Sequence, residues 1–382
     1  LLAIHHLVVD GVSWRILLDN LQTAYSQVRA GQTIELAEKS SSLLDWARVL
    51  QGYAETHDNE LNHWQSLASV PVELPCDEPH GENTSAWQTS IQLQLDKEQT
   101  EALLKAAPAA YRTQVNDILL TALGRALCDW SGHERILIDL EGHGREGLFE
   151  GVDLSRSVGW FTSLFPVALA PNGELGEALK RVKEGLREIP NKGLGYGVFT
   201  DLGNTEQQQA LRALPKARVV FNYLGQFDGS FNDSTLWAPA QESAGTCFDG
   251  DAPQQHDLAI NGQVYAGQLT LSVRFSKARY RHASVQALAN RFQRELEALV
   301  DHCSGGVHGA TPSDFPLASI SQQHLDRLPL EFDNLADLYP LSPMQQGMLF
   351  HSLYDVHGSA YLNQLRVDID GLEPARFKAA WE

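Results

Sequence analysis

The sequence has few cysteines, no long apolar run and little positive charge, and each shortage argues against a class of protein. Its four cysteines, at positions 76, 128, 247 and 303, form no CxxC pair, which disfavours a structural zinc site and a disulfide framework and suits a reducing cytoplasm. No apolar run approaches the length of a bilayer span, so no membrane partner is expected. Lys and Arg total 29 against 48 Asp and Glu, and the resulting formal net charge of −19 repels nucleic-acid phosphates.

What is present is the composition of a globular protein. The 382 residues are 43% hydrophobic and 20% charged, which is an ordinary balance for a folded chain with room for two lobes or domains. The chain begins at Leu1, inside an apolar stretch and without a methionine, so we expect it to be a piece of something longer.

Predicted strands alternate with predicted helices along most of the chain. Apolar residues at helical spacing predict helices over 13–28, 43–68 with a break near His57, 115–130 and 283–300. Strand-type runs fall at 1–6, 87–95, 136–140, 160–169, 219–223 and 269–275. We expect Ser13 to cap the first helix and 193–197 to be a flexible glycine loop. The alternation predicts an α/β fold with a mixed sheet.

The composition changes after Cys303. Glycines and prolines between 305 and 316 predict a linker that runs over 303–334. A new unit then begins, and its residues 335–382 are too few to bury a core of their own.

The densest candidate for chemistry is the run from His5 to Gly11, His-His-Leu-Val-Val-Asp-Gly. Adjacent residues on a strand face opposite ways, so only one imidazole of the pair can face a given cavity, where it can carry a proton near neutral pH. The alternative is a hydrogen-bonded core histidine followed by a turn into a helix. A metal site lacks ligands, because adjacent histidines do not easily chelate one ion and no Cys or Asp/Glu cluster is near.

A second candidate is Glu141-Gly142-His143-Gly144-Arg145-Glu146, directly after a predicted strand. Two glycines around a histidine let the backbone turn tightly and approach another group closely, and a partly desolvated carboxylate at a strand end can be a general base. The alternative is a charged surface turn. Asn222 and Tyr223, at the end of a later strand, either face a cleft or cap local backbone.

Together, in order and spacing, these segments resemble the core motifs of epimerization domains in non-ribosomal peptide synthetases. The resemblance covers residues 1 to about 302 and rests on six segments: HHLVVDGVSW from His5, NDILLTALG from Asn116, EGHGRE from Glu141, RSVGWFTSLFP from Arg156, NKGLGYG from Asn191 and FNYLGQF from Phe221. The EGHGRE and FNYLG segments separate this group from ordinary condensation domains, which share HHxxxDG. The tail YPLSPMQQGMLFH from Tyr339 resembles the opening motif of a condensation domain.

The resemblance implies a two-lobed fold like that of chloramphenicol acetyltransferase, with an active-site tunnel between the lobes. Residues 1–86 are then the remainder of a truncated N-terminal lobe, 87–302 the C-terminal lobe, 303–334 the interdomain linker and 335–382 the incomplete start of the next condensation domain. Because about a third of a domain is missing before HHxxxDG, the resemblance predicts that this chain alone folds poorly and is inactive.

The implied reaction is Cα proton exchange that converts an L-aminoacyl or peptidyl thioester to the D form. The substrate hangs on the 4′-phosphopantetheine arm of the upstream carrier domain, and the epimerization domain binds no cofactor of its own. The expected partners are that carrier and the downstream condensation domain. The amino acid, the product and the carrier interface are not encoded in these motifs.

By position, the resemblance implies that His6, Glu141 and Tyr223 are catalytic, with His6 and Glu141 on opposite sides of the tunnel in undetermined acid and base roles. Asp10 is expected to hold the histidine loop, through Arg156 or another arginine. The other residues expected to bind substrate or shape the site are His5, Ser13, His143, Arg145, Trp160 and Asn222.

Two other functions fit the same motifs. A condensation domain that forms peptide bonds would use the HHxxxDG histidine without needing Glu141. A degenerate domain would serve only as a docking scaffold for carriers, although the intact His6, Glu141 and Tyr223 argue against this.

Overall fold

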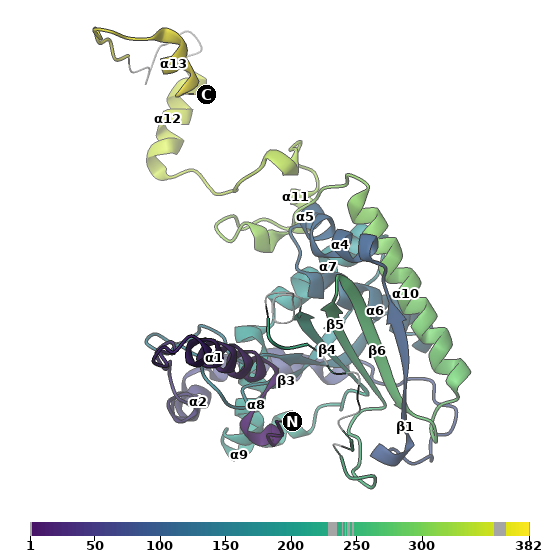
Figure 1. Ribbon diagram of the computed structural model, residues 1–382. Helices are drawn as coiled ribbons and strands as arrows, with labels where there is room; N and C mark the ends of the chain where they lie inside the picture. Colours follow the sequence, from purple (N-terminus) through teal and green to yellow (C-terminus); the bar gives the residue numbers. More distant parts are fainter. Residues whose placement is uncertain are drawn as a thin grey trace. The chain divides into compact units, whose positions relative to one another are not determined.

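The computed structural model forms two units (Figure 1). It describes residues 2–227, 235–238, 240, 242, 245–246, 248–354 and 364–381. The first unit comprises residues 1–314 and 320–334, and the second comprises 315–319 and 335–382.

The first unit is built on a six-stranded mixed sheet with the order β1-β6-β5-β4-β2-β3. Strands β2, β4 and β5 are parallel to one another, and the remaining neighbours are antiparallel. The strands are β1 Gln88–Gln94, β2 Ile136–Gly142, β3 Ser163–Leu169, β4 Val219–Gln226, β5 Leu258–Tyr265 and β6 Gln268–Ser276. The predicted α/β class with a mixed sheet is confirmed, whereas β5 had not been predicted.

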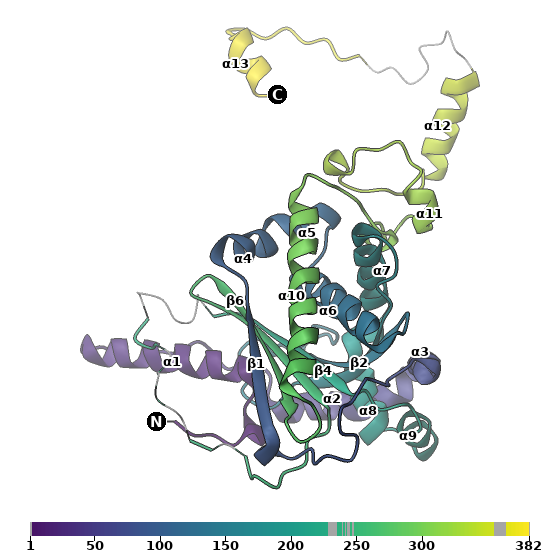
Figure 2. The same ribbon diagram turned by 90° about the vertical axis from the view of Figure 1, so that its right-hand side faces the viewer.

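One face of the sheet is apolar and forms the core with two long helices. A single register row across the six strands is buried throughout: Phe165, Leu140, Phe221, Ile260, Val273 and Ile91. Helices α6 Val115–Ser131 and α10 His282–Ser304 pack together beside the sheet (Figure 2), as their predicted apolar stripes require. Figure 1 shows α1 and α2 on the other side of the sheet from α10.

The neighbouring register row turns to the opposite face and is polar except for Leu164 on β3. It contains Glu141, Asn222, Asn261, Ser272 and Gln92. Since side chains alternate along each strand, burial of the apolar row fixes these polar residues on the face away from α6 and α10.

The predicted strand over 1–6 is wrong. Residues 2–5 are irregular and exposed, and they lead into a short 3₁₀ helix, η1 His6–Val8. In the described part of the chain no strand pairs with this segment, so its backbone has no ladder to join. Burial begins only at Val9.

The cap of the first helix also differs from the prediction. Helix α1 Gly11–Arg29 is capped by Asp10, whose side chain accepts a hydrogen bond from Ser13 N at 2.7 Å. Ser13 lies inside the first turn and is buried, so its predicted capping role is wrong.

The predicted flexible loop over 193–197 is helical instead. A 3₁₀ turn, η5 Pro190–Gly193, leads directly into α8 Leu194–Asp201. Asn191 Nδ2 donates to Tyr53 Oη at 2.7 Å and to the buried Glu60 carboxylate at 2.6 Å, which fixes the turn. Gly193 has φ 85°, and a Cβ there would lie 2.2 Å from the Phe165 ring.

The remaining elements of the first unit surround this framework. The predicted break near His57 is confirmed, because His57 is the C-cap of α2. These elements are α2 Leu43–Thr56, η2 Asp58–Glu60, α3 Leu61–Ser66, η3 Leu67–Ser69, η4 Ser85–Trp87, α4 Lys97–Leu104, α5 Ala106–Tyr111, α7 Leu175–Arg187, α9 Thr205–Arg212, η6 Pro312–Asp314, α11 Gln322–Leu325 and η7 Phe332–Asn334.

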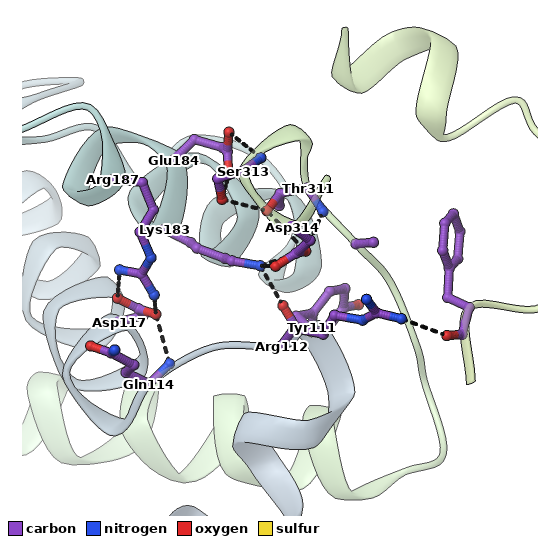
Figure 3. Close-up of polar contacts among 12 residues, drawn as sticks. Tyr111, Arg112, Gln114, Asp117, Lys183, Glu184, Arg187, Thr311, Ser313 and Asp314 are labelled. Atoms are coloured by element: carbon purple, nitrogen blue, oxygen red, sulfur yellow. Dashed lines mark hydrogen bonds and ion pairs between the residues drawn. The ribbon is translucent and has the colours of Figure 1, made fainter. Parts of the chain in front are cut away.

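The segment after α10 is anchored to α7 by a buried ion pair (Figure 3). Lys183 Nζ lies 2.6 and 2.7 Å from the two Asp314 carboxylate oxygens and donates to Tyr111 O at 2.9 Å. The side chains of Lys183 and Asp314 are only 1% and 10% exposed. Burial lowers the pKa of Lys183, and the Asp314 partner opposes that effect.

Further contacts extend this anchoring along the same segment. Asp314 also accepts from Thr311 N at 2.8 Å, and Ser313 Oγ donates to Glu184. Lys180 pairs with Asp326 at 2.6 Å. Residues 303–314 and 320–334, which lie in the predicted linker, therefore pack against the rest of the first unit.

In the described residues of the second unit there are two short helices, α12 Pro343–Tyr354 and α13 Pro374–Ala379. None of the described residues between 335 and 381 is fully buried, and most are exposed. Among the described residues of the whole chain, no helix has the length and apolar character needed to cross a bilayer.

Replacing Lys183 with Met is expected to destabilise the first unit by about 3–5 kcal/mol, because the Asp314 carboxylate stays buried without its cation. Chemical denaturation followed by circular dichroism measures the change. Lys180→Met removes the more exposed pair and is the control, with a loss of about 1 kcal/mol or less. Equal, small losses for both variants would show that the buried pair does not hold the segment.

Candidate active site

A cavity of about 570 Å³ opens where the ends of β2 and β4 meet the start of α1. Because β2 and β4 are parallel, their C-terminal ends lie at the same edge of the sheet. The lining comes from three groups of residues: Ile4, His6, Val9, Asp10, Gly11, Val12, Trp14 and Arg15; Asn116, Glu141, Gly142, His143, Trp160 and Thr162; and Asn222, Tyr223, Leu224, Gly225 and Phe227.

Glu141 is a candidate acid–base group that lines this cavity. It sits at the end of β2, and Asn222 Nδ2 from β4 donates to its Oε2 at 2.5 Å. Burial raises the pKa of Glu141, while the positive charges of His256, His6 and Arg274 oppose the rise. A carboxyl with a raised pKa can exchange a proton nearer neutral pH than an exposed one.

His6 lies on η1 and faces the same cavity. Its ring is 5.5 Å from the Trp160 ring, and both residues line the cavity. His5 does not line it, since its Nδ1 accepts the backbone N–H of Leu7 at 3.1 Å and caps η1. The structure thus brings only one of the two imidazoles into the cavity, although the local backbone is not a strand.

Asp10 is held by Arg145. The Arg145 guanidinium lies 2.8 Å from Asp10 Oδ1, and Phe161 N donates to Oδ2 at 3.1 Å. Burial favours a higher pKa for Asp10, but hydrogen bonds from Ser13 and Phe161 and the Arg145 charge outweigh it and hold the pKa below its ordinary value. Asp10 is therefore a carboxylate that fixes the loop after His6.

The arginine first expected at Asp10 is elsewhere. Arg156 donates to Asp19 and Asn20 on α1, so of the two alternatives expected for Asp10, Arg156 or another arginine, the second is the one that the structure shows. The partner of Asp10 is Arg145, four residues after Glu141. Sequence spacing alone does not show which of Arg145 and Arg156 reaches Asp10.

Arg145 joins several segments behind the cavity. It donates to the carbonyls of Leu154 at 3.1 Å and Ser157 at 2.6 Å and to Ser13 Oγ at 2.9 Å. Its guanidinium also lies 4.1 Å from the Phe161 ring centre. Ser13 Oγ in turn donates to Gly159 O at 2.9 Å. Arg145 and Ser13 do not line the cavity, but they connect its walls.

The loop after Glu141 needs its glycine. Gly144 has φ 63°, and a Cβ there would lie 1.6 Å from Phe161 O, so only glycine fits. The predicted close backbone approach is confirmed at this position. His143 lines the cavity, with its Nδ1 accepting from Arg145 N at 3.0 Å and its Nε2 3.3 Å from Glu146.

Tyr223 lines the cavity beside an arginine that the sequence did not single out. Burial raises the pKa of Tyr223 to about 12, and the Arg15 charge opposes the rise. Arg15 Nη2 donates to Leu224 O at 2.5 Å, and its guanidinium lies 4.6 Å from the Phe227 ring centre. At neutral pH Tyr223 is thus a phenol that can donate a hydrogen bond.

Sequence reasoning also missed Asn116. It lies in the first turn of α6 and lines the cavity, and its Oδ1 is buried without a hydrogen-bond partner. The signal was available, because Asn116 opens the NDILLTALG motif. In the described part of the chain, no cluster of His, Cys, Asp or Glu could hold a metal ion.

The fold and cavity define an α/β enzyme domain with acid–base groups at one edge of a mixed sheet. Residues 1–315 match the family model described as "Condensation domain". The chain therefore belongs to the condensation-domain family of non-ribosomal peptide synthetases, which confirms the family predicted from its motifs.

Individual relatives agree with this family. Over 391 residues the chain is 44% identical to a linear gramicidin synthase protein of Brevibacillus parabrevis, a match that spans all of this chain and 5% of the synthase protein. The solved epimerization domain from the third module of tyrocidine synthetase B is similar at 36% identity with a TM-score of 0.73, over 79% of this chain and 68% of that one. The condensation domain from the Monacolin K polyketide synthase MokA shares the fold, at 18% identity and a TM-score of 0.58 over 78% of this chain and 69% of that one.

Replacing Arg145 with Lys is expected to destabilise the first unit by about 1–3 kcal/mol, because an ammonium cannot reach Asp10, Ser13 and two carbonyls together. Thermal unfolding by calorimetry measures the change. The control, Arg156→Lys, alters a partner of the exposed Asp19 and should change stability little. If both variants unfold like the unsubstituted protein, Arg145 does not connect these segments.

The raised pKa of Glu141 predicts a pH-dependent stability. The folded protein prefers the protonated carboxyl, so this contribution is full below the ordinary glutamate pKa and is lost as pH rises through the raised value. Glu141→Gln mimics the protonated form, so the unfolding free energy of the unsubstituted protein should fall relative to that variant with rising pH. Denaturation series at several pH values measure both free energies. An unsubstituted protein that gains stability relative to the variant as pH rises would contradict the raised pKa.

Proposed function

We propose that the first unit is an epimerization domain that equilibrates the L and D forms of a carrier-bound aminoacyl or peptidyl thioester. The observation that carries this proposal is the presence in one cavity of His6 and of Glu141, which is half-buried and accepts a hydrogen bond from Asn222. A condensation reaction needs the histidine but has no use for a carboxyl tuned in this way.

The chemistry requires one group to remove the Cα proton and another to return a proton on the opposite face. A thioester favours this step because its α-proton is more acidic than that of an ester or an amide. In the proposal, Glu141 and His6 act from the two sides, one as base and one as acid. Each turnover moves one proton off Cα and one proton onto it, so the thioester bond stays intact.

The enolate-like oxygen that develops needs donors nearby. Tyr223 retains its phenolic proton because burial raises its pKa to about 12, so it is suited to donate a hydrogen bond rather than to act as a base. Asn222 Nδ2 is engaged with Glu141 and orients that carboxyl. His143 and Trp160 line the remaining cavity wall, and Trp160 packs against the His6 ring.

The proposed substrate implies the partners. The thioester is carried on the 4′-phosphopantetheine arm of an upstream carrier domain, which must approach the cavity from solvent. We further propose that residues 335–382 begin the condensation domain of the next module, in keeping with the motif from Tyr339. The chain spans only a small part of the length of its curated relatives, 5% of the gramicidin synthase protein.

Glu141→Gln in the synthetase that carries this chain is expected to lower L-to-D conversion of the carrier-bound substrate by roughly a hundredfold or more, the scale of a lost general acid–base group. Chiral analysis of the released aminoacyl group measures the conversion. Glu295→Gln is a matched control, because Glu295 is also a shielded, hydrogen-bonded carboxylate but lies on α10.

The same variant separates the two reactions of this family. If the unsubstituted protein forms peptide bonds without any L-to-D conversion, and Glu141→Gln leaves peptide-bond formation intact, the domain is a condensation enzyme and the proposal is wrong. If Glu141→Gln leaves L-to-D conversion intact, the acid–base role proposed for Glu141 is wrong. If neither reaction occurs with a loaded carrier, the docking-scaffold alternative holds.

A further inference from the structure

Asp139 shares the polar face of the sheet with Glu141. The two residues are two positions apart on β2, so their side chains leave the strand on the same side, roughly 7 Å apart at the backbone. Asp139 does not line the cavity and none of the sequence motifs includes it. Asp139 is the residue on this face of β2 that comes directly before Glu141.

His256, in the segment just before β5, contacts this aspartate. His256 Nε2 lies 2.7 Å from Asp139 Oδ2, and the two side chains are only 13% and 19% exposed. At this distance the Asp139 carboxylate accepts a hydrogen bond from the imidazole and fixes the orientation of the ring, and an imidazolium there would form an ion pair with it. Long separation in sequence, 117 positions, hid this pair from motif reasoning.

The charged surroundings of Glu141 come from several elements. Positive charge faces it from His256, from His6 on η1 and from Arg274 on β6. The strand register places Arg274 on the same face of the sheet as Asp139, because the two residues belong to one row that also contains Val220 and Ala259. On the side of Asp139, Tyr196 from α8 is a further titratable neighbour.

We propose that Asp139 and His256 form a positioning pair that keeps a positive charge beside Glu141 and so sets the pH range in which Glu141 is a carboxylate. The effect of this pair on catalysis rests on the proposed epimerase function. The titration of Glu141 that tests the pair does not depend on that function. Neither residue lines the cavity. Asp139 orients and charges the imidazole, and the imidazole stabilises the ionised Glu141.

The consequence for the reaction follows from the position of Glu141. Burial raises the pKa of a carboxyl, so it lowers the fraction of the group that is ionised and able to remove a proton. In the proposal, a His256 imidazolium held beside Glu141 and outside the cavity increases the fraction of Glu141 that is ionised. His6 cannot serve this purpose throughout the reaction, because it exchanges its own proton with the substrate in the proposed mechanism.

The direct test is the titration of the Glu141 carboxyl in the full 382-residue chain. Glutamate labelled with ¹³C at the side-chain carboxyl gives one NMR signal per residue, and the Glu141→Gln variant identifies the signal of Glu141. His256→Gln keeps a hydrogen-bond donor towards Asp139 but removes the charge, so the Glu141 midpoint should move to higher pH. An unchanged midpoint, or one that moves to lower pH, overturns the proposal.

Asp139→Asn tests the role of the aspartate separately. If Asp139 serves to hold the imidazolium, this variant should move the Glu141 midpoint in the same direction as His256→Gln. A shift to lower pH would mean that Asp139 acts only as a nearby negative charge, which contradicts the pair. His302→Gln is the matched control, because His302 Nε2 has a comparable contact with Tyr111 Oη at 2.9 Å but lies on α10.

The pH profile of L-to-D conversion gives the functional readout. In His256→Gln the acidic limb should move to higher pH, with a several-fold loss below the midpoint and near-normal conversion well above it. A uniform loss at every pH indicates a purely structural role and overturns the proposal. If the unsubstituted protein shows no conversion, the epimerase function fails, while the carboxyl titration still decides whether the pair controls Glu141.

Discussion

The buried contact between Asp10 and Arg145 is the interaction on which the candidate site depends. Asp10 caps α1 and follows the His6 turn, whereas Arg145 belongs to the loop after Glu141. One ion pair of 2.8 Å thus ties the two halves of the proposed acid–base system together, although 135 positions separate them in the chain. Without it, His6 would sit on an exposed 3₁₀ turn with little to hold it over the sheet edge.

The sheet supplies the second constraint. Its apolar face must be buried against α6 and α10, so the alternating residues, Glu141 and Asn222 among them, are forced onto the opposite face. Parallel pairing of β2 and β4 then places these two side chains within hydrogen-bonding distance. The site is polar because these side chains leave the sheet on this face. Glu141 lies at the end of β2 among the residues that line the cavity, and burial there raises the pKa of its carboxyl.

Periodicity predicted most helices and the apolar strands, because α6 and α10 carry continuous stripes and a mixed sheet follows from alternation. It failed where tertiary contacts decide. The 1–6 run is apolar but has no partner strand among the described residues, and the turn at Asn191 is fixed by Glu60 from another element. Family motifs identified the cavity residues, but they could not show that Arg145 rather than Arg156 holds Asp10. Nor could they show the His256–Asp139 pair, whose members lie outside every motif.

In the proposed mechanism Glu141 and His6 act on opposite faces of one Cα. The most direct measurement loads the carrier separately with L- and D-aminoacyl groups in deuterated water and follows deuterium at Cα by mass spectrometry in Glu141→Gln and His6→Gln. We expect each variant to retain wash-in from one enantiomer only, and the retained enantiomer to be opposite in the two variants. Equal wash-in from both enantiomers in either variant would contradict the two-sided arrangement.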